Sequence, residues 1–171
     1  MAQKKGMEIV NRFGKALPIP KIQLPRKVTG FECIKISLID RNAIAFLQRF
    51  RHLFSVCPIN LITDMFSERI LEFILQNIWP MIAKNICAIY LMKYTFRHLR
   101  KFVPTILDDC PSLRIISFHA GVDYFFTEFP PDDSAMASDG QALAKWLLIP
   151  HPDDVPKVLK CWLNMEKGIG R

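Results

Sequence analysis

A short phrase recurs in altered form along this chain: CPINLI, which begins at Cys57, returns as CPSLRIISF, which begins at Cys110. A third run of strand-forming residues that also carries a cysteine, ICAIYLM, begins between them at Ile86. Each run adjoins a stretch with helical periodicity, which predicts strand–helix units of roughly 23 to 30 residues, close to the period of leucine-rich repeats. We therefore expect an α/β fold, an irregular leucine-rich-repeat-like solenoid of about four or five strand–helix units.

Charge is unevenly distributed along the 171 residues, and this divides the chain. Residues 1–30 hold three prolines, three glycines and most of the +7 net charge, so we expect a basic flexible arm or linker there. Half of all residues are hydrophobic, which is enough for one domain with a buried core. We place this domain at 31–165 and a short tail at 166–171.

Apolar and polar residues alternate in the predicted strands and define two faces. The alternation is visible in CIKISL, which begins at Cys33, and Leu113, Ile116 and Phe118 match the L-x-x-L-x-L spacing of a leucine-rich-repeat strand. Residues between the apolar positions of such a strand point away from the core. We expect them to form a protein-binding face: Lys35, Ser37, Tyr90, Met92, Ser117, His119, Lys160 and Trp162.

Helical periodicity follows the predicted strands. Four isoleucines recur at every fourth position and predict a helix with a broad apolar stripe: Ile70, Ile74, Ile78 and Ile82. Pro80 is expected to kink or end that helix. In the next helix Phe102 is expected on the apolar stripe and Arg100 on the polar or junction face. Ser138 begins an S-x-x-Q capping box, which predicts a further helix.

The sequence contains no constellation that is typical of catalysis. Its four histidines are scattered, and no catalytic or nucleotide-binding motif occurs. Adjacent acids at 108–109, 132–133 and 153–154 are typical of solvated turns, since acid–base catalysis requires groups that converge on one reacting atom. We therefore expect no enzyme activity and no cofactor.

Five cysteines lie singly in or beside predicted strands, and none forms a CxxC pair. This spacing predicts free, mostly buried thiols rather than disulfides or a metal site. The thiols are those of Cys33, Cys57, Cys87, Cys110 and Cys161.

Targeting signals are not evident. The apolar stretches are interrupted by polar residues before they reach the roughly 20 residues that a membrane span needs. No apolar segment follows the N-terminal charges as in a signal peptide. We expect an intracellular protein, cytoplasmic or nuclear, with no membrane partner.

Residues 31–165 carry a series of short motifs in a characteristic order: LIDRNAIAFL, IWP, NIC, LRKF, CPSLR, FPPDDS and ALAKWL. In this order they resemble the F-box domain-containing proteins expanded in plant-parasitic nematodes. In that family an N-terminal F-box precedes a region that resembles leucine-rich repeats. The resemblance implies that the repeats select a protein target and that the F-box docks a cullin-type ubiquitin ligase.

The expected function is therefore non-catalytic binding of a protein target, as in the substrate-recruiting region of an F-box adaptor. Residues 1–30 have no sustained apolar stripe for F-box helices, so we expect a cullin-type ligase as partner only if an F-box is supplied. Two alternatives stay open: a nucleic-acid-associated protein that uses the basic arm, and a degenerate fragment without activity of its own. A neutral body behind a basic arm argues against nucleic acid.

Overall fold

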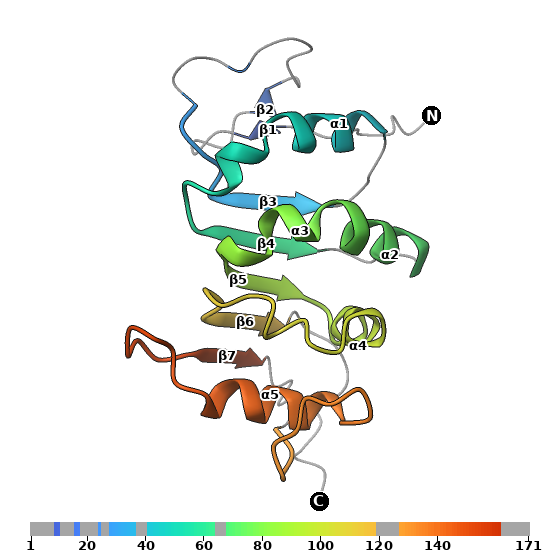
Figure 1. Cartoon of the computed structure of the whole chain (residues 1–171), viewed down its shortest axis with the longest axis vertical. Helices are drawn as coiled ribbons and strands as arrows, with labels where there is room; N and C mark the ends of the chain where they lie inside the picture. Colours follow the sequence, from blue (N-terminus) through green and yellow to red (C-terminus); the bar gives the residue numbers. More distant parts are fainter. Residues whose placement is uncertain are drawn as a thin grey trace, which may run out of the picture.

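The computed structural model describes residues 9–10, 16–17, 24, 28–36, 41–63, 68–118 and 127–161. Within these ranges the main body is a five-stranded parallel sheet covered by helices, which confirms the predicted α/β class (Figure 1). Its strands are β3 (Cys33–Ile36), β4 (Ile59–Thr63), β5 (Ile86–Leu91), β6 (Ile115–Phe118) and β7 (Val158–Cys161). The strands lie side by side in the order of the chain, and each neighbouring pair is parallel.

The helices form a second layer in the same order. The segment between β3 and β4 forms α1 (Arg41–Arg49) and the 3₁₀ turn η1 (Arg51–Phe54), and three segments precede β5: α2 (Glu68–Asn77), α3 (Trp79–Ile82) and the 3₁₀ turn η2 (Ala83–Asn85). They are followed by α4 (Lys93–Phe102) and α5 (Asp139–Leu148). Contacts join η1 to α3, α2 to α4 and α4 to α5, so the helices pack against their successors along the stack of strands.

Hydrophobic side chains from one face of the sheet meet this helical layer. The residues paired across the five strands at the centre of that face are Ile34, Leu61, Ile89, Ile116 and Leu159. All of them belong to the core or pack against it. The first four are about 27 residues apart, within the range of leucine-rich repeats, whereas the last unit is longer.

The structure confirms that the isoleucine stripe predicted from the sequence packs in the core. Ile74, Ile78 and Ile82 are buried, as is Trp79. α2 ends at Asn77, and the new helix α3 begins at Trp79, after one intervening residue, with a proline in its first turn. A proline is tolerated there because the first backbone N–H groups of a helix have no partner within it.

One assignment on α4 was wrong. Phe102, expected on the apolar stripe, is 37% exposed. Arg100, expected on the polar or junction face, is only 6% exposed and lies at the junction of α4 with residues 134–139. The core side of this helix is centred on Phe96 and Leu99. At about 100° per residue Arg100 lies about 70° and Phe102 about 90° from the midpoint between Phe96 and Leu99, so both lie at the edges of the core side and their burial depends on the neighbouring segments.

Aromatic rings close the β3 end of the core. Phe31 stacks on Phe54 at 5.2 Å between ring centroids and meets Phe46 edge-on at 6.2 Å. The preceding Gly30 lies so close to Cys57 that a Cβ there would be 2.7 Å from Cys57 Sγ. A larger residue at Gly30 would displace this packing.

Two short strands lie in the segment predicted as an arm. β1 (Ile9–Val10) and β2 (Ala16–Leu17) pair in antiparallel fashion, which the sequence did not predict. The basic residues of the arm lie outside the described residues: Lys4, Lys5, Arg12, Lys15, Lys21, Arg26 and Lys27. No helix within the described ranges is long and apolar enough to cross a membrane.

The thiols are free, as predicted, but they are not mostly buried. Cys110 is buried, Cys33 is exposed, and the other three are intermediate. The difference arises because Cys110 belongs to the hydrophobic core cluster, whereas Cys33, which pairs with Asn60, does not.

Candidate protein-binding face

The face of the sheet opposite the helices carries two rows of paired residues. The first row is Lys35, Ile62, Tyr90, Ser117 and Lys160, and the second is Cys33, Asn60, Ala88, Ile115 and Val158. None of the ten belongs to the hydrophobic core cluster, although Ala88 is only 1% exposed. We call this surface, defined by these two rows, the open face.

Four residues predicted from alternation are aligned by the fold. Lys35, Tyr90, Ser117 and Lys160 come from four different strands and share one row of the open face. Met92 is half-buried just beyond β5, where it precedes α4. The remaining three predicted residues, Ser37, His119 and Trp162, lie outside the described residues.

Exposure along the row is not uniform. Lys35 and Lys160 at its ends are exposed and Tyr90 is half-buried, but Ser117 is only 5% exposed. Ser117 is short and is paired on both sides with longer side chains, those of Tyr90 and Lys160. It therefore contributes little surface of its own, and a partner would contact mainly its neighbours.

Sequence reasoning missed the contribution of β4. Asn60 and Ile62 are half-exposed residues of the open face, on either side of the buried Leu61. The signal was present, since the same alternation that identified Lys35 runs through this strand. Ile115 and Val158 were missed for a different reason, because apolar residues next to a strand core resemble core residues themselves.

The pairing of β5 with β4 is interrupted by one extra residue in β5. The register between β4 and β5 shifts between Ile59 and Asn60, which pair with Ile86 and Ala88, so Cys87 is the extra residue. Its thiol lies 3.4 Å from Asn60 Oδ1 and 3.5 Å from the Ile59 carbonyl oxygen. Burial raises the pKa of Cys87, which favours the uncharged thiol as a hydrogen-bond donor.

The charges of the open face have one sign. The five strands contain two charged residues, Lys35 and Lys160, and no Asp or Glu. Partial burial raises the pKa of the neighbouring Cys33 thiol, while the Lys35 ammonium acts in the opposite direction. The face thus combines two cationic ends with an apolar and aromatic centre.

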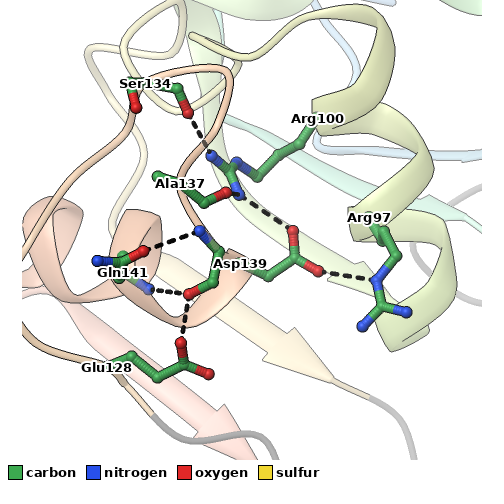
Figure 2. A network of polar contacts seen from close by, with 8 residues as sticks. Arg97, Arg100, Glu128, Ser134, Ala137, Asp139 and Gln141 are labelled. Atoms are coloured by element: carbon green, nitrogen blue, oxygen red, sulfur yellow. Dashed lines mark hydrogen bonds and ion pairs between the residues drawn. The ribbon is translucent and has the colours of Figure 1, made fainter.

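A polar network on the helical side joins α4 to the start of α5 (Figure 2). The Arg100 guanidinium donates through Nη1 to Ala137 O and Asp139 Oδ1, each at 3.1 Å, and through Nη2 to Ser134 O at 3.2 Å. Arg97, whose side chain is 69% exposed, reaches the other oxygen of Asp139 at 3.2 Å. One carboxylate therefore holds both arginines, and the buried one tethers residues 134–139.

The capping box predicted for α5 is confirmed next to this network. Ser138 Oγ accepts a hydrogen bond from the backbone N–H of Gln141 at 3.1 Å. The Gln141 side chain in turn accepts from the backbone N–H of Ser138 at 3.0 Å. Ser138 Oγ also lies 2.5 Å from Glu128 Oε2, which adds residue 128 to the same network (Figure 2).

The acid pairs are not simple solvated turns. Asp133 Oδ1 lies 2.5 Å from Lys145 Nζ, and this ammonium lowers the pKa of Asp133. Burial raises the pKa of Asp108, and a hydrogen bond to the Asp133 carboxylate raises it further. Asp153 pairs with Arg114 and lies 2.6 Å from His151 Nδ1.

Two of these acids connect separate segments of the chain. One carboxylate oxygen of Asp133 pairs with the Lys145 ammonium group. Asp108, in the turn after α4, forms a hydrogen bond with the same Asp133 carboxylate. Each group therefore holds a connection between two segments. Within the described ranges, no three His, Cys, Asp or Glu side chains gather so as to hold a metal ion.

No protein-family model, no curated protein and no solved structure matches this chain.

Proposed function

We propose that this chain is a non-catalytic protein-binding module whose open face contacts the target. The observation that carries the proposal is the alignment of Lys35, Tyr90 and Lys160, which come from strands far apart in the sequence, on one row. Side chains from several strands then present one continuous surface, as a binding module requires.

We further propose that the sheet and helices form an irregular solenoid of the leucine-rich-repeat type. Chain-ordered parallel strands, helices that contact their successors, and a core row at about 27-residue intervals support it. In such an arrangement each unit contacts only its neighbours, so one side of the sheet stays available along its length.

The resemblance to the F-box family leads to the proposed role: the open face would select a protein for a cullin-type ubiquitin ligase. Since no F-box pattern is evident in residues 1–30, we expect a pull-down with the isolated chain not to retain a Skp-family adaptor. Retention of the adaptor at micromolar concentration, abolished by deletion of residues 1–30, would contradict this expectation. Nucleic-acid binding by the basic arm stays the alternative, and a steep loss of binding with salt would favour it.

Two tyrosines four residues apart provide the test of the binding face. Tyr90 lies on the open face, whereas Tyr94 lies on α4 and is 36% exposed. A photo-crosslinking amino acid placed at Tyr90 should attach to the captured target in cell extract, and the same group at Tyr94 should not. Equal crosslinking from both positions, or crosslinking from Tyr94 alone, would show that the open face is not the binding surface.

A further inference from the structure

We propose that this chain associates with itself head to tail, with the acidic loop of residues 128–136 in one copy bound to a basic patch in the next. The basic patch consists of Arg49, Arg51, Val56 and Lys84. Neither surface includes a residue of the open face, so the inference goes beyond the proposed function. Figure 1 shows α5, which follows the acidic loop, and α1, which precedes the basic patch, at opposite ends of the stack of strands.

The sign of the charge changes along this stack. Residues 31–102, which contain β3 to β5, hold ten Lys or Arg against five Asp or Glu. Residues 103–171, which contain β6 and β7, hold six Lys or Arg against ten Asp or Glu. Since β3 and β7 are the two edges of the five-stranded sheet, one end of the molecule is basic and the other is acidic. Unlike ends of two copies therefore attract each other, whereas like ends repel.

The acidic loop presents carboxylates and large apolar side chains. Phe129 is 71% exposed and Met136 is 95% exposed. Glu128 is exposed and Asp132 is half-exposed, and neither forms an ion pair within the described residues. Hydrogen bonds from Ser134 lower the pKa of Asp132, so this carboxylate stays ionised at neutral pH. Exposed apolar surface that is rimmed by polar groups is typical of a protein interaction site.

The conformation of the loop is fixed before a partner binds. Arg100, which is buried, donates to the Ser134 carbonyl oxygen at 3.2 Å. The Gln141 side chain donates to the Pro130 carbonyl oxygen at 3.0 Å, and the Asp132 N–H donates to the Gln141 carbonyl oxygen at 3.3 Å. These contacts tie both halves of the loop to α4 and α5. An ordered loop loses little conformational entropy on binding, which favours its use as a contact.

The basic patch has the complementary chemistry. Arg49, Arg51 and Lys84 are exposed, and none of them forms an ion pair within the described ranges. η1 contacts α3 and η2 follows α3 directly, so Arg51 and Lys84 lie on two turns that meet at α3. Val56 is 62% exposed just after η1 and gives Phe129 an apolar surface to contact. Carboxylates and an apolar anchor thus meet cations and an apolar side chain.

The test is to mix two variants of the full-length chain. Because the loop and the patch are different surfaces, each contact leaves one of each free, and the wild-type chain should form open oligomers. Phe129→Ser with Met136→Ser removes the apolar side chains of the loop, and Arg51→Glu with Lys84→Glu reverses the charge of the patch. Each variant alone should be monomeric in sedimentation velocity at low salt. Their mixture should contain a one-to-one dimer, because each variant supplies the surface that the other lacks.

Salt and a matched substitution locate the contact. Between about 0.01 M and about 1 M salt the Debye length falls from about 30 Å to about 3 Å, so the wild-type oligomers should weaken about tenfold or more. Arg51→Glu alone should weaken them about tenfold. Lys160→Glu makes the same change in net charge on the open face and should leave association within about twofold. Unchanged melting temperatures would establish that all variants fold.

Three results would overturn the proposal. A wild-type chain that stays monomeric at about 1 mM in low salt would refute self-association. Wild-type oligomers without a one-to-one dimer in the mixture of variants would refute the head-to-tail arrangement. Equal weakening by Lys160→Glu and Arg51→Glu would show that net charge, and not the basic patch, governs association.

Discussion

Replacement of Arg100 by methionine should destabilise the chain far more than the same replacement of Arg97. Both guanidinium groups hold the Asp139 carboxylate, but Arg100 is 6% exposed and Arg97 is 69% exposed. The Arg100 substitution also leaves the carbonyl oxygens of Ser134 and Ala137 without their donor. Asp139 keeps one arginine partner in either variant, so the comparison isolates burial and the two carbonyl contacts.

The magnitude follows from those contacts. Removal of one partner of a buried ion pair costs about 3–5 kcal/mol when the other charge is left unpaired. Asp139 keeps Arg97 and methionine restores part of the packing of the Arg100 stem, but two carbonyl oxygens lose their donor, so we expect a loss at the lower end of this range, about 3 kcal/mol. The exposed Arg97 pair contributes about 0–1 kcal/mol. With an m-value of about 2 kcal/mol per molar urea, the midpoint should fall by about 1.5 M for Arg100→Met and by less than about 0.5 M for Arg97→Met. Equal shifts for the two variants would refute the burial argument.

Three further perturbations test other parts of the structure. Ile116→Asp should lower the free energy of unfolding by several kcal/mol, because it places a charge in the core. Ile115→Asp, on the open face, should leave a cooperative melting curve. Equal losses of stability in the two variants would show that the register is wrong. The pKa of Asp133 is lower in the folded chain than in the unfolded chain, where it is about 4, so Asp133 stabilises the fold above about pH 4 and this stabilisation is lost as the pH falls further. The raised pKa of Asp108 has the opposite effect. At pH 7 Asp133→Asn should therefore lower the urea midpoint and Asp108→Asn should leave it unchanged or raise it by about 0.5 M, and the difference should shrink at pH 3; a difference that grows in acid would contradict these signs. The Cys110 thiol should react with iodoacetamide only after denaturation, because it is buried and burial raises its pKa. The other four thiols should react first, and mass spectrometry of native and denatured samples distinguishes the two classes.

Local patterns were sufficient to predict the five strands of the parallel sheet, the helices between them and their order, but not the short strands β1 and β2. Alternation around Ile34 and the fourfold recurrence of Ile74 and Ile78 each depend on residues that are neighbours in the chain, so one sequence contains the information. The same alternation predicted one residue of the open-face row on each of four strands. The register that aligns them into one row depends on pairing between strands and was not predicted.

The role of Arg100 could not be read from the sequence. Its acceptors lie in residues 134–139, more than 30 positions later, and only the fold brings that segment against α4. A basic residue within a helix resembles a solvated one until such acceptors are located. The extra length of the last unit, which contains these acceptors, therefore has a structural reason: it supplies the carbonyl and carboxylate groups that make the burial of Arg100 favourable.

The tether at Arg100 also bears on the distant end of the open face. It holds Asp139 at the first turn of α5, and α5 is joined to the edge strand β7 because Lys157 Nζ donates to the Trp146 carbonyl oxygen at 2.7 Å and lies over its ring at 5.2 Å. Lys160 follows on β7, which pairs only with β6 among the described strands. Loss of Arg100 should thus loosen the β7 end of the row and spare the β3 end. Hydrogen exchange in Arg100→Met should quicken at α5 and β7 before β3 to β5, and uniform quickening across the sheet would show that the tether stabilises the domain as a whole.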